Sequence, residues 1–293
     1  NVRTFQNAVI GGQARAKGIP YVISAHGSLP FLSDHAQFKR GFDLLLGQRL
    51  IAGASQMLAV SEVEAEQFRQ AGIPAEKIAL VSNGIDLVEF TSPPKRGAFR
   101  AGQNLPADAR IILFLGRIHP IKGLDTLIAA FDRLSKRLDN LWLVIAGPDD
   151  GDLERLRGLA RHIPAADRVL FPGPLYGTDK LAALVDADVL AYPAAYEIFG
   201  LVPFEAILCG TPVIVTESSG AGGLIAEAQA GYLAPYADVG RLAETLRRAL
   251  ASPQESSQMV AAGQRYIREN LDWNLIVHQY EKLYTGCIPG DAQ

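Results

Sequence analysis

Short apolar segments alternate with helix-like segments along most of the chain, and this pattern limits the fold more than any other feature. The helix-like segments carry their apolar residues on one face, as 124–138 does. The apolar segments have the length of strands that are buried on both faces, and they lie at 21–25, 57–60, 78–81, 111–115, 141–146, 169–171, 189–192 and 213–215. Strands and helices that alternate at this spacing predict right-handed βαβ units and parallel sheets, so we assign the chain to the α/β class.

A stretch rich in proline and glycine, 91–108, separates two such alternating regions. We interpret it as an interdomain connection, which gives expected domains at 1–92 and 93–270. The remaining residues, 271–293, are expected to form a C-terminal helix that is capped by Asp272 and crosses back to the first domain. A chain of 293 residues, 48% of them hydrophobic, can bury the cores of two such domains.

The first region is expected to contain helices at 2–17 and 37–53. Ser61, followed three residues later by Glu64, has the spacing of a capping box at the start of a further helix. Three basic residues accompany the apolar face of the helix at 37–53, namely Lys39, Arg40 and Arg49. An ordinary amphipathic helix is favoured there, and peripheral contact with anionic lipid at the inner membrane face is the alternative.

Composition narrows the class of protein. A net charge of −3 gives no indication of a nucleic-acid-binding protein. The two cysteines, Cys209 and Cys287, are too few for a disulfide framework and favour the cytoplasm. No segment reaches the ~18–20 apolar residues of a transmembrane helix, and no signal peptide is recognisable.

Several polar or glycine-containing segments follow directly after predicted strands. They lie at 26–27, 83–84, 116–117, 147–148 and 197–200. Because open α/β sheets bind ligands at the carboxyl ends of their strands, these segments predict one shared site.

The most informative of them is 197–205, which reads EIFGLVPFE between an apolar strand and an apolar helix. The first backbone N–H groups of a helix lack partners and carry the positive end of its dipole, so Gly200 at this turn marks an anion site. Glu197 and Glu205 would repel a phosphate there, and they are better suited to accept hydrogen bonds from hydroxyl groups. An anion flanked by hydroxyl groups indicates a nucleotide sugar, with a ribose on one side and a hexose on the other.

Two cations follow the first strand of the second region, in the segment 116–123. Arg117 and Lys122 lie five residues apart across a turn and can converge on one diphosphate. A departing nucleoside diphosphate gains negative charge, so fixed cations here would stabilise the transition state more than the ground state.

Together, these two segments resemble the signature of the retaining glycosyltransferases of the large family 4 type, also called group 1, which have the GT-B fold. The resemblance covers nearly all 293 residues. It implies two Rossmann-like parallel-sheet domains facing a cleft, with 1–92 as the acceptor-side domain and 93–270 as the domain that binds the nucleotide sugar. The first domain is incomplete by comparison, because its opening strands and an early glycine-rich loop are missing, and we therefore expect an N-terminally truncated chain.

The resemblance also assigns roles to individual residues. Arg117 and Lys122 would bind phosphate in the segment that begins at Gly116, Glu197 would hold hydroxyl groups of the donor sugar, and Glu205 would accept from the ribose. The backbone N–H groups of Phe199, Gly200 and Leu201 would contact sugar hydroxyls or phosphate, although core packing explains the Phe199 side chain equally well. His26 resembles the position whose imidazole or backbone carbonyl faces the transferred sugar.

No metal or other cofactor is expected. The acidic cluster at 149–152 could suit Mg²⁺. The favoured interpretation is that its carboxylates open the helix that follows and interact with the helix dipole.

The resulting function is transfer of a hexose from a UDP-, GDP- or ADP-sugar to a glycan, a lipid-linked glycan or a small molecule, with retention of configuration. One alternative is nucleotide-sugar 2-epimerisation on the same fold, which would need acid and base carboxylates in the first domain that are not recognisable. The other alternative is a nucleotide-binding interaction module without turnover. We expect the chain itself to bind nucleotide but to turn over poorly.

Overall fold

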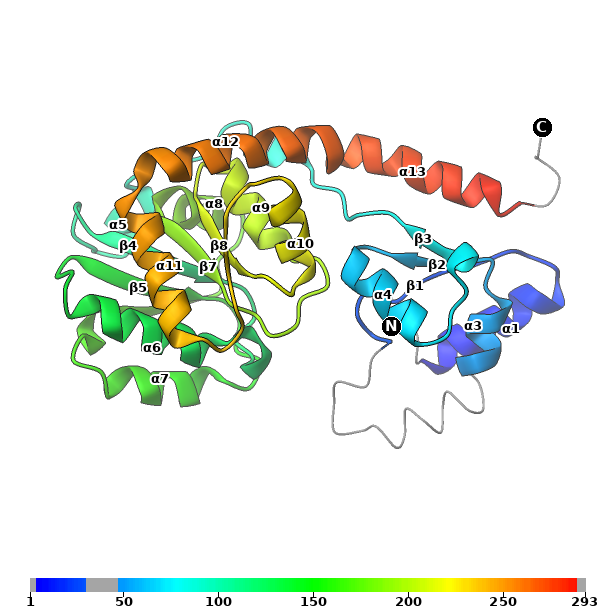
Figure 1. Ribbon diagram of the computed structural model, residues 1–293, viewed down its shortest axis with the longest axis horizontal. Coiled ribbons are helices and arrows are strands. Elements are labelled where there is room, and N and C mark those ends of the chain that lie inside the picture. Colours follow the sequence, from blue (N-terminus) through cyan, green and yellow to red (C-terminus); the bar gives the residue numbers. More distant parts are fainter. Residues whose placement is uncertain (1–3, 30–46, 289–293) are drawn as a thin grey trace. The chain divides into compact units, whose positions relative to one another are not determined.

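The structure, a computed structural model, describes residues 4–29 and 47–288 and divides the chain into two compact units. Unit 1 comprises Asn1–Gly84 together with Leu271–Gln293, and unit 2 comprises Ile85–Asn270. The division falls a few residues before the expected boundary at 92/93, and the C-terminal segment groups with unit 1. Figure 1 shows the elements of both units.

Unit 1 contains a three-stranded parallel sheet in the order β1-β2-β3. Its strands are β1 (Val22–Ser24), β2 (Gln56–Ala59) and β3 (Ile78–Leu80), and its helices are α1 (Phe5–Ala16), α3 (Gln48–Gly53), α4 (Glu62–Gln70) and α13 (Trp273–Gly286), with a 3-10 turn at Ala75–Lys77. Successive side chains of β2 face opposite sides of this sheet, as expected for a strand. Met57 packs in the cluster that contains Phe68 of α4, whereas Leu58 packs against Ile276 of α13. The C-terminal helix therefore covers one face of the small sheet.

Unit 2 contains a six-stranded sheet in the order β6-β5-β4-β7-β8-β9, in which every neighbouring pair is parallel. The strands are β4 (Arg110–Leu115), β5 (Leu141–Ala146), β6 (Val169–Gly173), β7 (Val189–Tyr192), β8 (Val213–Thr216) and β9 (Tyr232–Ala234). The four residues of β7 and those of β8 are all buried, which explains why these strands read as unbroken apolar runs. The chain builds outward from β4 to β6 and then returns to β7 on the other side of β4, so the order of strands reverses between β4 and β7.

Helices lie on both faces of this sheet, as Figure 1 shows. They are α5 (Ala98–Gly102), α6 (Leu124–Ser135), α7 (Leu153–Arg161), α8 (Gly177–Asp186), α9 (Leu201–Leu208), α10 (Gly220–Glu227), α11 (Val239–Ala251) and α12 (Pro253–Asn270), with 3-10 turns at Leu87–Phe90, Pro120–Lys122 and Ala166–Arg168. Helix α6 packs against α7 and α11, whereas α8 packs against α5 and α9, and α9 packs against α12. The parallel sheets and their helical layers confirm the predicted α/β class.

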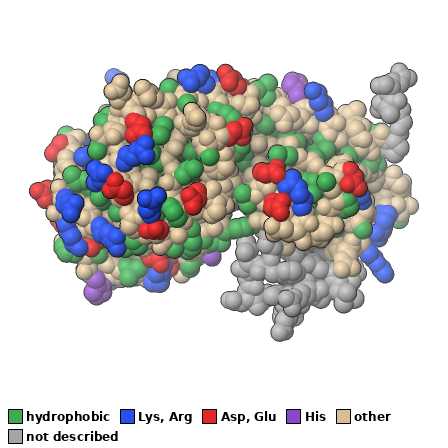
Figure 2. Space-filling model, in the orientation of Figure 1, with side chains coloured by type: hydrophobic (Ala, Val, Ile, Leu, Met, Phe, Trp, Pro, Cys, Tyr) green, Lys and Arg blue, Asp and Glu red, His purple; other side chains and the backbone are tan. Residues whose placement is uncertain are grey.

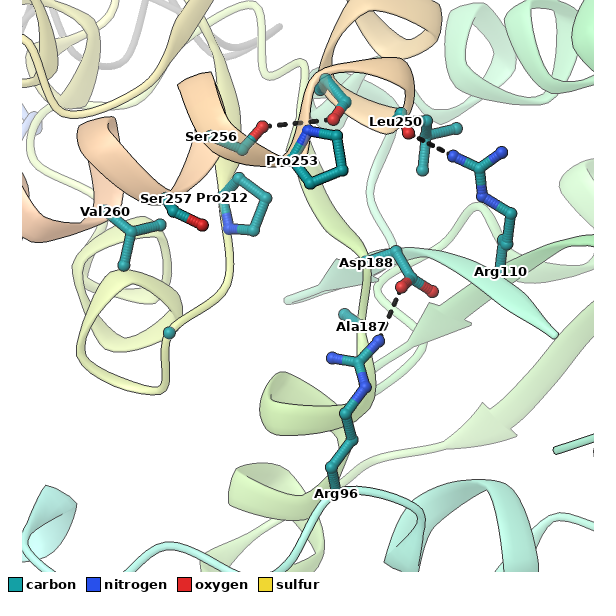
Figure 3. Close-up of a pocket in the computed structure, with 12 residues that line it drawn as sticks. Arg96, Arg110, Ala187, Asp188, Pro212, Leu250, Pro253, Ser256, Ser257 and Val260 are labelled. Atoms are coloured by element: carbon teal, nitrogen blue, oxygen red, sulfur yellow. Dashed lines mark hydrogen bonds and ion pairs between the residues drawn. The ribbon is translucent and has the colours of Figure 1, made fainter. Parts of the chain in front are cut away.

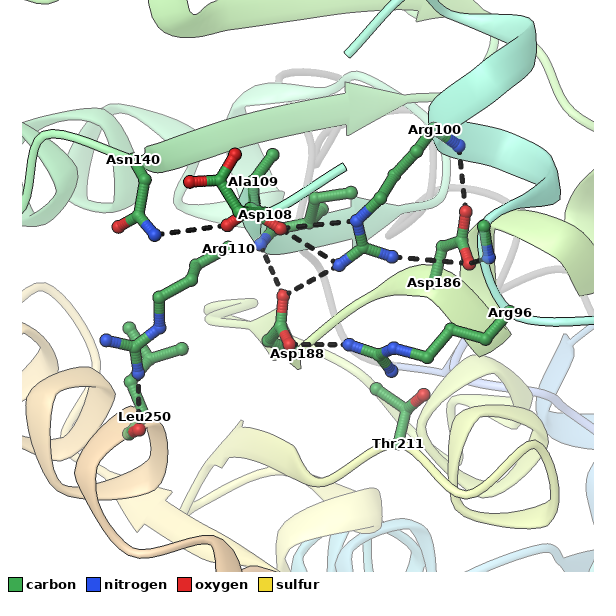
Figure 4. A network of polar contacts seen from close by, with 12 residues as sticks. Arg96, Arg100, Asp108, Ala109, Arg110, Asn140, Asp186, Asp188, Thr211 and Leu250 are labelled. Carbon is green, nitrogen blue, oxygen red and sulfur yellow. Dashed lines mark hydrogen bonds and ion pairs between the residues drawn. The ribbon is translucent and has the colours of Figure 1, made fainter. Parts of the chain in front are cut away.

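The amino ends of the strands in unit 2 hold a buried polar network (Figure 4). Asp186 is fully buried and accepts hydrogen bonds from the backbone N–H groups of Gly97 and Arg100, the latter at 2.8 Å. Asp188 accepts from the N–H of Ile111 at 2.7 Å and pairs with the Arg100 guanidinium at 3.1 Å. Because each carboxylate is matched by donors, the network joins α5 to the start of the sheet without leaving those charges unpaired.

A cavity of about 290 Å³ lies beside this network (Figure 3). Its lining includes Arg96, Arg110 and Asp188, together with Ser256 and Val260 of α12. Arg96 already pairs with Asp188 at 2.6 Å, and Arg110 donates to the carbonyl of Leu250. Figure 2 shows that positive and negative side chains are interspersed on the visible surface, in keeping with the small net charge.

The structure corrects several sequence-based boundaries. The helix expected at 2–17 is Phe5–Ala16, with Thr4 as its N-cap. The described part of the one expected at 37–53 is Gln48–Gly53, and Lys39 and Arg40 lie outside the described residues. Strand β9 and helix α10 were not predicted. Within the described ranges, no helix is long and apolar enough to cross a bilayer.

Candidate functional site

The loops that follow β4, β5 and β7 are joined to one another by backbone hydrogen bonds at the carboxyl edge of the sheet in unit 2. Ile118 donates to the carbonyl of Pro148 at 2.8 Å, and Asp150 donates back to Ile118 at 2.9 Å. Ala195, in the loop after β7, donates to the carbonyl of Ile121 at 2.8 Å. These bonds hold the two predicted segments, 116–123 and 197–205, in fixed register beside the point where the strand order reverses, which is where open α/β sheets bind ligands.

Lys122 and Glu197 contact each other directly. Lys122 Nζ lies 2.7 Å from Glu197 Oε2, and the two side chains are 7% and 20% exposed. Lys122 ends a 3-10 turn that begins at Pro120 and is capped by the side chain of His119. An ammonium group and a carboxylate that are this well shielded interact more strongly than a surface pair would.

Tyr192, the last residue of β7, completes this contact and was missed in the sequence. Its hydroxyl group donates to Glu197 Oε2 at 2.9 Å and accepts from Lys122 Nζ at 3.1 Å. Its ring stacks on Phe114 with a centroid separation of 5.6 Å, and the ammonium group lies 5.0 Å from the ring centroid. Burial, together with the negative charge of Glu197, raises the pKa of Tyr192 well above its ordinary value, so the hydroxyl group stays protonated and remains a donor. We call Lys122, Tyr192 and Glu197 the cation triad.

Helix α9 begins directly beside the triad. Its N-cap, Gly200, has φ 72°, and a Cβ atom at this position would lie 2.9 Å from Cγ of Glu197. Only glycine fits this left-handed turn comfortably, so the turn brings the start of the helix close to the Glu197 side chain. Within the described residues, no side chain caps α9, and no recorded backbone bond uses the N–H of Gly200 or Leu201. These donors are therefore available to an anion.

The Phe199 side chain is 3% exposed and packs on Phe204, with ring centroids 5.4 Å apart. It has the core-packing role that the sequence allowed for. Gly116, at the start of the other loop, donates its N–H to the carbonyl of Ala146 at 3.0 Å.

Glu205 belongs to a second charged group in unit 2. It lies 3.3 Å from Lys180 Nζ of α8, and Lys180 also pairs with Glu89 at 2.9 Å. Burial raises the pKa of Glu205 despite the nearby positive charge of Lys180. Burial acts in the opposite sense on Lys180, but the hydrogen bond to Glu89 and the charge of Glu205 outweigh it and raise its pKa. The shifts have the same sign because Lys180 has two carboxylate partners, whereas Glu205 shares one cation with another acid.

Arg117 extends into solvent, with 63% of its side chain exposed, and it pairs with Asp150. Within the acidic cluster, Asp149 has the structural role at the start of the helix that the sequence favoured. One oxygen of Asp149 accepts from the N–H groups of Gly151, Asp152 and Leu153 at 3.0–3.2 Å, directly before α7. The bond from Leu153 lowers the pKa of Asp149. Among the described residues, no group of three or more His, Cys, Asp or Glu side chains is placed to hold a metal ion.

His26 lies in unit 1, directly after β1. It is exposed and adopts a left-handed conformation with φ 45°, which is uncommon for a residue other than glycine. The N–H of the next residue, Gly27, donates to Oε1 of Glu64 at 2.6 Å. The structure thus brings Lys122 and Glu197 together, places Arg117 and Gly116 in the same loop as Lys122, and leaves Glu205 in a separate charged group.

Comparison with protein families identifies the class of this chain. Residues 95–266 match the model for "Glycosyl transferases group 1", and residues 2–89 match the model for "Glycosyltransferase Family 4". The chain therefore belongs to the group 1 glycosyltransferases, as the two motifs predicted.

Curated relatives include a D-inositol 3-phosphate glycosyltransferase from Saccharomonospora viridis, 33% identical over 250 residues, which cover 82% of this chain and 58% of the relative. The enzyme of that name from Mycolicibacterium smegmatis is 34% identical over 208 residues, or 69% of this chain and 47% of the relative. The chain thus spans about half the length of these relatives.

Solved structures with the same fold include sucrose-phosphate synthase from Thermosynechococcus elongatus, with a TM-score of 0.80, 28% identity and coverage of 95% of this chain and 71% of that one. HepE from Anabaena, solved in complex with UDP, gives a TM-score of 0.84 at 23% identity, with coverage of 96% and 76%. These matches confirm the predicted GT-B fold.

Proposed function

We propose that this chain carries the donor-binding half of a reaction that transfers a hexose from a nucleoside diphosphate sugar to an acceptor, with retention of configuration. The observation that carries the proposal is the cation triad, which lies at the reversal point of a parallel sheet and beside the uncapped start of α9. A buried cation, free helical N–H groups and a shielded carboxylate match the diphosphate and the hydroxyl groups of such a donor. HepE, which shares the fold, has been solved with UDP-glucose, which supports this class of donor.

In the proposed complex, Lys122 and the N–H groups at the start of α9 face the diphosphate, and Arg117 swings from Asp150 to add a second cation. Glu197 accepts from hydroxyl groups of the sugar, and Glu205 accepts from the ribose. The leaving diphosphate gains negative charge as the glycosidic bond breaks, and these fixed donors stabilise that charge without reorganising. The proposed chemistry needs no metal ion, because the cations and the helix dipole supply the positive charge. We also propose that His26 faces the transferred sugar.

A glycan, a lipid-linked glycan or a small molecule would each offer the hydroxyl group that the reaction needs. The relatives named for inositol 3-phosphate support a polar hydroxylated acceptor. The two free cysteines fit a reducing compartment, so we propose a cytoplasmic location.

Calorimetry with UDP, GDP and ADP tests donor binding. Arg117→Ala removes an exposed side chain, so the fold should be unaffected, and the affinity for the preferred nucleotide should fall by the ~1.5–3 kcal/mol of a hydrogen bond to a charged group. Arg161→Ala, at the exposed end of α7, is the matched control and should bind as the wild type does. Failure of all three nucleotides to bind the wild type would refute the proposal.

Turnover is tested separately, by hydrolysis and transfer assays with sugar donors of the base that binds. Glu197→Gln should keep the affinity for the free nucleotide but lose turnover, because the lost contact is to the sugar. Proton NMR of the product gives its anomeric configuration, and inversion would contradict the retaining mechanism. A chain that binds nucleotide tightly but hydrolyses no donor would instead favour the interaction module.

A further inference from the structure

A fully buried carboxylate in unit 1 holds the turn that contains His26. Glu64 has no exposed surface, and its two oxygen atoms accept from two different parts of the chain. Oε1 accepts from the N–H of Gly27 at 2.6 Å, and Oε2 accepts from the N–H of Val60 at 2.9 Å. The carboxylate thus links the turn after β1 to the end of β2.

This arrangement differs from the capping box that the sequence predicted. Ser61 does cap α4, because its hydroxyl group accepts from the N–H of Glu64 at 3.3 Å. In a capping box, Glu64 would return the bond to the N–H of Ser61. Instead, it bonds to the preceding residue and reaches across the sheet to Gly27, 37 residues away in the sequence. The Glu64 side chain therefore holds the turn at His26–Gly27 in addition to its place at the start of α4.

The bond to Gly27 determines the orientation of a whole peptide group. The N–H of Gly27 and the carbonyl of His26 belong to one planar trans peptide, so they point in opposite directions. Fixing the N–H on Glu64 fixes the direction of the His26 carbonyl. The turn is further held by Ser28, whose N–H and hydroxyl group both donate to the carbonyl of Ala25, at 3.1 Å and 2.6 Å. These bonds offset the strain of the left-handed conformation at His26.

The buried position of the Glu64 carboxylate has a cost in free energy. Burying a charge costs free energy unless hydrogen bonds compensate for it, and no Lys, Arg or His within the described residues forms a recorded ion pair with Glu64. Its compensation comes from two backbone donors, and a charged acceptor binds them more strongly than an amide would. An apolar side chain here would leave the N–H groups of Gly27 and Val60 without this acceptor, so the carboxylate is what fixes the orientation of the turn.

We propose that Glu64 is a positioning residue, which holds the His26–Gly27 peptide in the orientation that the transfer step requires. This inference rests on the proposed function, in which His26 faces the transferred sugar. Glu64 itself touches no substrate. Its effect should therefore appear in turnover rather than in the binding of the nucleotide, which the residues of unit 2 carry.

The test compares Glu64→Gln with Ser61→Ala. Glutamine keeps the volume but can accept only one of the two bonds with its oxygen, and it turns an N–H₂ group toward the other donor. Ser61→Ala removes the cap of the same helix without touching Gly27, and it is expected to lower stability by about 1 kcal/mol. Both variants should therefore melt at lower temperatures, whereas only Glu64→Gln should lower kcat, by about 10- to 100-fold for a reacting group displaced on the order of 1 Å. The affinity of both variants for the free nucleotide should stay within about twofold of wild type.

A second measurement does not depend on activity. In protein labelled with ¹⁵N-glycine, the amide proton of Gly27 should resonate downfield and exchange slowly in the wild type and in Ser61→Ala. In Glu64→Gln, it should shift upfield and exchange faster. If the glutamine variant does not fold, the wild-type signal still decides, because a rapidly exchanging Gly27 amide would overturn the inference.

The outcomes separate the two proposals. A wild type that binds no nucleotide and hydrolyses no donor refutes the proposed function, and the catalytic part of this inference falls with it, whatever the Gly27 signal shows. A wild type that turns over, with a Glu64→Gln variant whose kcat matches that of Ser61→Ala, refutes the positioning role and leaves the proposed function standing.

Discussion

Removing one oxygen atom from Tyr192 tests how the cation triad is held. Tyr192→Phe keeps the ring, its stacking on Phe114 and the packing of β7, since Phe fills the same volume apart from the hydroxyl group. What disappears is one donor to Glu197 Oε2 at 2.9 Å and one acceptor for Lys122 Nζ at 3.1 Å. The direct contact between Lys122 and Glu197, at 2.7 Å, remains.

The expected loss of stability can be estimated from these contacts. A hydrogen bond to a charged group contributes about 1.5–3 kcal/mol to stability. Two such bonds are lost, but Lys122 and Glu197 still satisfy each other, so we expect the loss of about one bond rather than two. Unit 2 should therefore be less stable by about 1.5–3 kcal/mol, with an unchanged dependence on denaturant, because the surface exposed on unfolding is the same.

Urea unfolding followed by the fluorescence of Trp142 in β5 measures this loss. Trp273 is replaced by Phe in every variant, so that the emission reports on unit 2 alone. Tyr176→Phe is the matched control, because Tyr176 is 72% exposed, and a change there should stay within about 0.5 kcal/mol. If Tyr192→Phe is as stable as that control, the hydroxyl group does not hold the triad, and the reasoning from its geometry is wrong.

Two further predictions concern the packing of unit 1 and the acid stability of unit 2. Gly84→Ala should destabilise unit 1 by about 1–3 kcal/mol, because the new Cβ would lie 2.2 Å from a ring carbon of Trp273, and close-packed sites accommodate added atoms poorly. Gly12→Ala, in α1 of the same unit and with open space around its Cβ, is the control for thermal unfolding, and equal melting temperatures would contradict the predicted clash. Asp149→Ala should lower the melting temperature at neutral pH, because hydrogen bonds from the backbone hold the pKa of Asp149 below its ordinary value of 3.8. A depressed pKa stabilises the fold above that value and loses its effect as the pH falls through the folded-state pKa, so the two melting curves should converge in acid, and a constant difference down to pH ~2 would count against this explanation.

The central strands of unit 2 could be predicted because strands that are buried on both faces consist of consecutive apolar residues. Val189–Tyr192 and Val213–Thr216 are buried at every position, and the sequence shows them as unbroken apolar runs. Helix α10 could not be predicted in this way. Three of its eight residues are glycine, which has a poor helix propensity, and packing against the sheet overrides that preference.

The motif with two glutamates, 197–205, and the motif with two cations, 116–123, could be recognised because each lies within one short segment. The partners that complete them could not, because they depend on how distant segments meet. Tyr192 reads as one more apolar residue of a strand, and its hydroxyl group becomes meaningful only when the loop after β4 brings Lys122 to it. Lys180 reads as a surface charge of a helix, and nothing local indicates that it lies between Glu89 and Glu205.

Glu64 is a residue for which a local sequence signal was correct only in part. Its spacing from Ser61 is a correct signal for the start of α4, and the Ser61 half of that signal is confirmed. The second half was wrong because a competing acceptor site existed elsewhere in the fold. The N–H of Gly27 has no sequence signal that would connect it to a helix 37 residues away.

Because all six strands of unit 2 run in the same direction, the unit has a structural end and a chemical end. The Asp186 and Asp188 network occupies the first, and the loops around Lys122 and Glu197 occupy the second. On the function proposed above, an engineer could therefore randomise the chemical end in search of a new donor preference while keeping every residue of the structural end unchanged. The same separation means that stabilising substitutions are best sought around the cavity beside Arg110, where improved packing does not disturb the loops that hold the triad.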